Sequence, residues 1–298
     1  MIKRTLFFGN PVYLSTKNNQ IVIAYPDKTQ ETKTTAIEDI GVIVLESQQI
    51  TITNGLLEKL INNNVALINC DQQHMPIGLL MPLNGHTEQS ERFKNQINAS
   101  VPLKKNLWQQ TISAKISNQA GLLKEKGIPC RKMEIWAKEV TSGDALNHES
   151  RAAVFYWQKL IQIENFTRGQ EGIAPNNLLN YGYAILRAIT ARAIVSSGML
   201  PTLGIFHRNK YNAYCLADDI MEPYRPYVDL IVCHIMETED DFSELTTEIK
   251  KQLLNIATID VLIDGKKSPL MVAMSRTTNS LNECFEGISR KILYPIYA

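Results

Sequence analysis

Short apolar runs separated by polar turns fill the first 82 residues, and this alternation is typical of β-strands. The predicted strands are the segments TLFFGN, PVYLST, IVIAY, GVIVLES, QQITIT, VALINCD and IGLLMPL. The four residues Lys-Asn-Asn-Gln at 17–20 predict a hairpin turn before IVIAY. A short helix, GLLEKLINN, interrupts the strands, and Asn54 is its expected N-cap. This part lacks a cluster of catalytic residue types, so we expect it to serve packing or dimer formation.

From residue 101 onward, apolar residues recur at helical spacing, as in the segment LWQQTISAKISNQAGLL. Between the two regions lies the polar stretch NGHTEQSERFKNQ, which predicts a linker. The sequence therefore predicts an α+β protein. We expect a small β-rich N-terminal domain at residues 1–84, a linker at 85–100, and a larger all-helical domain at 101–298 whose tail is also helical.

The composition is that of an ordinary soluble protein, because 44% of residues are hydrophobic and 20% are charged. The five cysteines show no CxxC spacing, which indicates a reduced protein without a disulfide framework or a structural zinc. The N-terminus lacks the pattern of a signal peptide, and no apolar run approaches the roughly 18 residues of a membrane span. We therefore expect a cytoplasmic protein with no membrane partner.

The net charge of +1 hides an uneven distribution along the chain. Residues 101–210 hold 15 Lys and Arg against 7 Asp and Glu, whereas residues 211–298 hold 8 against 14. A phosphate backbone is attracted by local cations rather than by a high overall charge. The basic middle segment is thus compatible with nucleic-acid binding. Solvated helix faces of mixed sign would explain the same asymmetry.

The stretch from Gly204 to Asp229 concentrates charged and titratable residues between apolar runs. Its members are His207, the acids Asp218, Asp219 and Glu222, and the cations Arg208, Lys210 and Arg225. On a helix, Glu222 shares a face with the two aspartates three and four residues before it. Carboxylates on one face repel each other, and a cation relieves that repulsion. The spacing therefore predicts a divalent metal site.

Carboxylates and an imidazole without thiolates suit Mg²⁺ or Mn²⁺ better than structural zinc. Two assignments stay open at this level. His207 is either a ligand or a packed turn histidine. Glu149, near the start of another predicted helix, is either a ligand or a first-turn acid favoured by the helix dipole.

Four separated segments resemble, in order and spacing, the motifs of the CRISPR-associated spacer-acquisition integrase family. They are HESRAAVFYW, NNLLNYGYAILRA, GMLPTLGIFHRNK and LADDIMEPYRPYVD. The N-terminal segments ITITNGLLEKLINNNVALINCD and MPIGLLMPLNGH also fit, so the resemblance covers essentially the whole chain. LLMPLNGH and LWQQTISAKISNQAGLL look most like versions from type II systems.

The resemblance implies roles for individual residues. Glu149, His207 and Glu222 match the metal ligands, and Asp219 matches a second acid important for catalysis. The implied DNA-binding residues are Tyr183, Arg208, Lys210 and Arg225. Many relatives have Gly where this chain has Ser150, but the preceding ligand is kept. We expect Asp218 to be a helix cap or a support for the ligands, and His148 and His234 to be structural.

The resemblance also implies a function, in the cytoplasm of a prokaryote. We expect a DNA endonuclease and integrase that uses Mg²⁺ or Mn²⁺ to insert captured DNA fragments into a CRISPR array by 3′-hydroxyl attack. The expected partners are double-stranded DNA (prespacer and repeat), a second copy of the chain, a small ferredoxin-like second adaptation protein and other type II CRISPR components. The alternatives are a hydrolytic metal-dependent nuclease and a non-catalytic DNA-binding scaffold.

Overall fold

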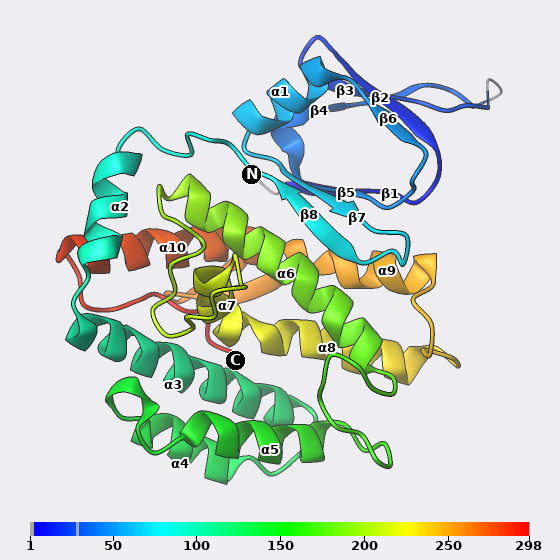
Figure 1. Cartoon of the computed structure of the whole chain (residues 1–298). Coiled ribbons are helices and arrows are strands. Elements are labelled where there is room, and N and C mark those ends of the chain that lie inside the picture. Colours follow the sequence, from blue (N-terminus) through cyan, green and yellow to red (C-terminus); the bar gives the residue numbers. More distant parts are fainter. Residues whose placement is uncertain (1–2, 28–29, 298) are drawn as a thin grey trace. The chain divides into compact units, whose positions relative to one another are not determined.

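The computed structural model describes residues 3–27 and 30–297. It divides the chain into two compact units, with the boundary between Thr87 and Glu88 (Figure 1). The first unit is rich in β-strands and the second in helices, which confirms the predicted α+β class. Among the described residues, no helix has the length and apolar character needed to cross a membrane.

Two four-stranded sheets form the described part of the N-terminal unit. The first has the order β1–β5–β7–β8, which are Arg4–Phe8, Ile40–Leu45, Ala66–Cys70 and Pro76–Leu80. The second has the order β4–β3–β2–β6, which are Lys33–Ala36, Gln20–Ala24, Val12–Lys17 and Ile50–Ile52. The strands β1, β5 and β7 run parallel, and β8 is antiparallel to β7. Apolar side chains from both sheets and from α1 (Asn54–Asn62) pack into one core.

Local chemistry explains two details of this unit. The strands β2 and β3 pair with Lys17 opposite Gln20, and both intervening asparagines have positive φ angles, so the expected hairpin turn is confirmed. The N-cap of α1 is Thr53 and not Asn54, because the Thr53 side chain accepts the backbone N–H of Leu56. Both residue types cap helices well, so only the backbone conformation decides which of two neighbouring residues is the N-cap.

Helices α2–α10 build the second unit. In chain order their bounds are Gln89–Asn98, Val101–Glu125, Arg131–Glu139, His148–Leu160, Asn176–Ser196, Cys215–Met221, Arg225–Thr238, Thr247–Leu254 and Leu270–Glu286. The 3₁₀ turns of the chain, η1–η4, are Ile37–Asp39, Ser142–Asp144, Glu222–Tyr224 and Asn255–Ala257. The long helix α3 packs against α4 and α5, and α6 packs against α7, α8 and α10 (Figure 1).

The residues expected to form a linker fold differently, because α2 occupies most of the stretch 85–100. The Gln96 side chain is buried and binds the carbonyls of Leu200 and Leu203, at 2.9 and 3.1 Å, and the N–H of Leu200. Arg92 donates to the carbonyl of Ser197. The polar side chains of this stretch thus form hydrogen bonds with the backbone of a turn in the same unit, and they are not polar merely because water surrounds them.

The second unit is also not entirely helical. The strands β9 (Asp260–Ile263) and β10 (Lys266–Pro269) form an antiparallel hairpin before α10. Residues 287–297 do not continue as a helix, which corrects the expected helical tail. Ile296 instead bonds to Leu262 and extends the hairpin by one bridge.

Candidate active site

Two of the three expected ligands, Glu149 and Glu222, meet at a lysine of α3. Glu149 is the second residue of α5, and Glu222 follows α7 at the start of the turn η3. Lys115 of α3 lies between them, with its Nζ atom 2.7 Å from Glu149 Oε1 and 2.7 Å from Glu222 Oε2. Arg225 Nη2 lies 3.0 Å from Glu222 Oε1. The two glutamates thus converge on one buried ammonium group.

Electrostatics support charged states for this cluster. Burial favours the neutral form of Lys115, but the Glu222 and Glu149 carboxylates outweigh it and raise the pKa of the ammonium. Burial also disfavours ionised Glu222, yet Arg225 and Lys115 outweigh that effect and hold its pKa below the ordinary value. The neighbouring cations Arg225 and Lys115 therefore favour the ionised form of Glu222.

The backbone around Glu149 is fixed by a buried acid. Both carboxylate oxygens of Asp144 accept backbone N–H groups at the start of α5, from His148 and from Glu149, each at 2.9 Å. A carboxylate at a helix N-terminus is favoured by the free N–H groups and by the helix dipole. Asp144 therefore sets the direction from which Glu149 enters the site.

His207 lies in the loop before α7 and is oriented by Asp219. Its Nδ1 atom is 2.5 Å from Asp219 Oδ1, and Asp219 also accepts the backbone N–H groups of Phe206 and His207, at 2.9 and 3.3 Å. The hydrogen bond with Asp219 raises the pKa of His207. A carboxylate on one ring nitrogen is the usual support for a histidine that binds a metal through the other. Nε2 of His207 is thus the nitrogen left for a ligand role.

The loop that carries His207 approaches α7 so closely that position 204 requires glycine. A Cβ atom on Gly204 would collide with the carbonyl oxygen of His207 and lie 2.8 Å from Asp219 Oδ2. The absence of a side chain therefore lets the loop close over the carboxylate that orients His207.

The two aspartates of the cluster have other partners. Asp219 is completely buried and uses both oxygens on the His207 loop. Asp218 binds Arg187 Nε through one oxygen and Asn212 Nδ2 through the other, each at 2.6 Å. Both acids therefore act as supports, and Glu222 is the acid of this cluster that faces Glu149 across Lys115.

The donor set fits a hard divalent cation, although Lys115 stands at its centre. Among the residues the structure describes, no three His, Cys, Asp or Glu side chains are already grouped for an ion. Glu222 Oε2 is buried and, despite its ion-pair contact with Lys115, has no aligned hydrogen-bond donor within the described chain. Two carboxylates that converge on one cation, with an oriented imidazole nearby, offer the ligand types that Mg²⁺ and Mn²⁺ accept.

The expected DNA-binding residues fall into two environments. Tyr183 is buried and donates to Asp229 Oδ1 at 2.5 Å, and its ring lies within cation–π distance of the guanidinium groups of Arg168 and Arg225. Tyr183 and Arg225 thus belong to the support of Glu222. Arg208 and Lys210 are exposed on the His207 loop.

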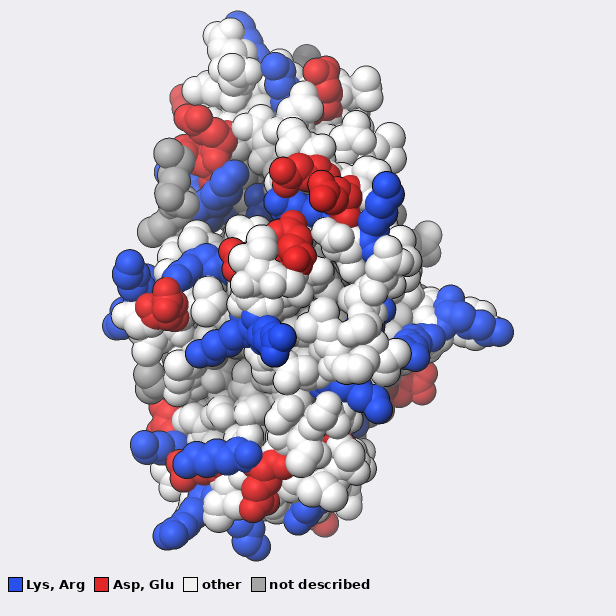
Figure 2. All heavy atoms as spheres, turned by 90° about the vertical axis from the view of Figure 1, so that its left-hand side faces the viewer, with Lys and Arg blue, Asp and Glu red and all other residues white. Residues whose placement is uncertain are grey.

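The exposed loop residues lie beside an aromatic side chain that sequence reasoning missed. Tyr211 is 84% exposed, and Lys210 Nζ lies 4.8 Å from its ring centroid. In Figure 2, the face drawn carries many separate Lys and Arg side chains with Asp and Glu among them.

Sequence reasoning also missed Lys115, although a signal for it exists. The polar residues Thr111, Lys115, Asn118 and Gln119 recur at helical spacing within the buried face of α3. Polar residues on such a face are held by partners elsewhere in the fold. Lys115 meets the glutamates, and Asn118 binds the backbone beside one of them.

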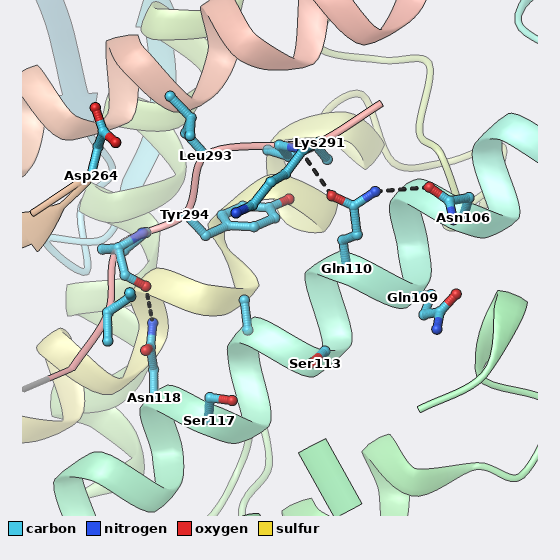
Figure 3. A pocket seen from close by; sticks show the side chains of 14 residues that line it. Asn106, Gln109, Gln110, Ser113, Ser117, Asn118, Asp264, Lys291, Leu293 and Tyr294 are labelled. Carbon is cyan, nitrogen blue, oxygen red and sulfur yellow. Dashed lines mark hydrogen bonds between the residues drawn. The ribbon is translucent and has the colours of Figure 1, made fainter. Parts of the chain in front are cut away.

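Asn118 connects the site to the end of the chain. Its amide nitrogen donates to the carbonyls of Pro223 and Pro295, at 2.7 and 3.0 Å, and its oxygen accepts the N–H of Tyr297 at 3.0 Å. Figure 3 shows Asn118 and Gln110 pointing from α3 toward this segment, along a cavity of about 580 Å³. None of the three expected ligands lines this cavity.

Comparison with known proteins identifies the family. The model of the family "CRISPR associated protein Cas1" matches residues 6–257. The chain is similar to the CRISPR-associated endonuclease Cas1 of Neisseria meningitidis serogroup C, with 38% identity over 282 residues that cover 94% of this chain and 91% of the relative.

The fold is also found in solved structures. A casposase bound to an integration product has a TM-score of 0.78 at 20% identity and covers 98% of this chain and 92% of its own. A chain of a Cas6-RT-Cas1–Cas2 complex has a TM-score of 0.73 at 20% identity, covering 97% of this chain and 35% of its own. The match over residues 6–257 and the 38% identical relative confirm the resemblance seen in the motifs, and they place this chain in the CRISPR-associated Cas1 family.

Proposed function

We propose that this protein is a metal-dependent DNA endonuclease and integrase of CRISPR adaptation. The names of the family and of the endonuclease relative support a role in DNA cleavage, and the casposase that shares the fold supports DNA joining. The observation that carries the proposal is the convergence of Glu149 and Glu222 on one cation. His207 is close enough for both glutamates to act on the charge of its ring, and Asp219 orients that ring through Nδ1.

The proposed ligands are Glu149, Glu222 and His207 Nε2. A bound Mg²⁺ or Mn²⁺ would supply positive charge for the reacting phosphate and lower the pKa of the attacking oxygen. The protein's own contribution is to hold the ligands still. Arg225 fixes the second oxygen of Glu222, and Asp219 fixes the imidazole ring. Groups held in this way do not need to reorganise during the reaction.

The proposed reaction is a transesterification. The 3′-hydroxyl oxygen of a captured DNA fragment forms a bond to a phosphorus at the border of a CRISPR repeat. The bond from that phosphorus to the 3′-oxygen of the repeat strand breaks, and the leaving oxygen takes up a proton. The number of phosphodiester bonds is unchanged, so the same residues allow the reverse reaction.

We also propose the assembly in which this reaction occurs. Its parts are double-stranded DNA, a homodimer formed through the N-terminal unit, and a small ferredoxin-like second adaptation protein. A solved structure that shares the fold is a Cas6-RT-Cas1–Cas2 complex, which supports the second protein. The other type II components, like the type II assignment itself, stay predictions from the sequence.

A strand-transfer assay tests the proposal. Purified protein would be incubated with a short duplex that has free 3′-hydroxyls, a supercoiled plasmid carrying a repeat, and Mg²⁺ or Mn²⁺, with and without the second adaptation protein. We expect joined product from wild type and none from Glu149→Ala, His207→Ala or Glu222→Ala. Glu164→Ala, at an exposed acid, is the matched control and should join as wild type does.

The same assay separates the alternatives. Nicked plasmid without joined product would favour a hydrolytic nuclease. A scaffold without catalysis would give neither product in any variant while DNA binding persists.

A further inference from the structure

Lys115 occupies the place where the two glutamate ligands meet. Its Nζ atom is 2.7 Å from an oxygen of each, and its side chain is largely buried on α3. Two carboxylates brought together without a cation repel each other in a buried site. The ammonium group of Lys115 removes that repulsion, so the site is assembled before any ion arrives.

A divalent ion and the Lys115 ammonium cannot share this position. Mg²⁺ binds oxygen ligands at about 2.1 Å, so an ion that contacts both glutamate oxygens would lie where Nζ now lies. Two cations at that separation would also repel each other strongly. Binding of the ion through both glutamates therefore requires Lys115 to leave.

The surroundings permit this exchange. A lysine side chain has a flexible four-carbon stem and can redirect its charge. Glu222 would keep its position during the exchange, because Arg225 Nη2 holds its other oxygen at 3.0 Å. Glu149 would keep its backbone position, because Asp144 binds its N–H.

We propose that Lys115 is an internal cation that holds Glu149 and Glu222 together in the metal-free protein and is displaced when a divalent ion binds between them. Lys115 thus stabilises the empty site and weakens ion binding. The inference rests on the proposed function, because it assumes that these glutamates are ligands. It assigns a positioning role to a residue of α3 that the sequence motifs do not include.

Mn²⁺ binding without DNA tests the inference. Full-length wild type and Lys115→Met would be titrated with Mn²⁺ by calorimetry, with free Mn²⁺ counted by electron paramagnetic resonance. We expect Lys115→Met to bind at least about tenfold more tightly, because the competing charge is gone. Its metal-free melting temperature should fall, and Mn²⁺ should raise that temperature more than it does for wild type.

The chain offers a matched control. Lys126 forms an ion pair with Glu237 at 2.6 Å in the same unit, and neither residue belongs to the candidate site. Lys126→Met should leave Mn²⁺ affinity unchanged. If Lys115→Met does not fold, Lys115→Gln removes the charge while keeping a polar tip and carries the same test.

The outcomes separate the inference from the function beneath it. Suppose that Glu149→Gln abolishes Mn²⁺ binding, but a folded variant with a neutral residue at 115 binds Mn²⁺ no more tightly than wild type. That result would overturn the inference alone. If Mn²⁺ binding does not depend on Glu149 in any variant, so that Glu149→Gln changes nothing, the metal site itself is overturned and the inference with it.

Discussion

At the scale of single residues, the site depends on groups that support the ligands rather than on the ligands alone. Asp219 uses its oxygens on the His207 ring and on two backbone N–H groups. Asp144 does the same for the first turn of α5. Such supports set where a ligand points, and removing them commonly costs metal affinity or activity without removing the ligand.

Replacing Asp219 by Asn tests this support. The amide keeps the size of the side chain but loses the charge that holds the His207 ring. We expect strand transfer and Mn²⁺ affinity to fall by about 10- to 100-fold while the protein remains folded. Circular dichroism would check the fold, and the same two assays would measure the losses. Wild-type Mn²⁺ affinity in a folded variant would contradict the role of Asp219.

A second buried acid predicts a pH dependence of stability. Asp229 accepts hydrogen bonds from Tyr156 and Tyr183, and burial raises its pKa to about 6. Since the folded-state pKa lies above the unfolded value, this residue favours folding below pH ~4, and its contribution is lost as pH rises through about 6.

The comparison with Asp229→Asn isolates this effect. Relative to the variant, the free energy of unfolding of wild type should decrease between pH ~4 and pH ~6.5, by up to about 3 kcal/mol. Urea unfolding at several pH values would measure the difference. A difference that is constant over this range would show that Asp229 does not titrate as the structure indicates.

At the scale of elements, α3 organises the second unit. It presents Lys115 to the glutamates, and it presents Asn118 both to the backbone after Glu222 and to the end of the chain. One helix face thus couples the position of η3 to residues 287–297. The helix α2 shows the same principle, since its polar residues bind the backbone of the turn after α6.

Replacing Asn118 by Ala tests the coupling. The carbonyl of Pro223 and the N–H of Tyr297 would lose their buried partner, at a cost of about 1–3 kcal/mol in the free energy of unfolding. Mn²⁺ affinity should also fall, because η3 positions Glu222. Urea unfolding and calorimetry would measure the two effects. Ser117→Ala, at an exposed position of the same helix, should change neither.

At the scale of the whole molecule, the candidate catalytic residues all belong to the second unit. The N-terminal unit contributes sheets and a separate core. The basic excess of residues 101–210 therefore lies in the unit that carries the site. On the proposed function, this unit contacts the phosphate backbone, and binding should weaken steeply as salt increases.

Arg208 and Lys210 provide the test at this scale, because both are exposed on the His207 loop. The double variant Arg208→Ala/Lys210→Ala should bind duplex DNA more weakly at every sequence. The slope of log affinity against log salt should fall by about 1 for each phosphate contact removed. Fluorescence anisotropy at several salt concentrations would measure this. An unchanged slope would place the phosphate contacts elsewhere. The control is Lys251→Ala, at an exposed lysine of α9.

The sequence by itself determined features that depend on near neighbours or on the order of motifs. The hairpin at Asn18 and Asn19 follows from two residues that tolerate positive φ, and helical spacing indicated the second unit. The family was also readable, because its motifs keep their order along the chain. Composition misjudged α2, since a polar side chain looks the same whether it binds water or a buried carbonyl. The expected helical tail was wrong, because Ile296 bonds to Leu262, a residue far from it in the sequence.

Only the tertiary structure decided which groups meet. Lys115, Glu149 and Glu222 come from three elements, and no spacing along the chain predicts that one nitrogen lies 2.7 Å from both carboxylates. The division of labour among the acids was decided in the same way, with Asp218 and Asp219 turned toward Arg187 and His207. Helical spacing places side chains on a face, but the elements packed against that face select their partners.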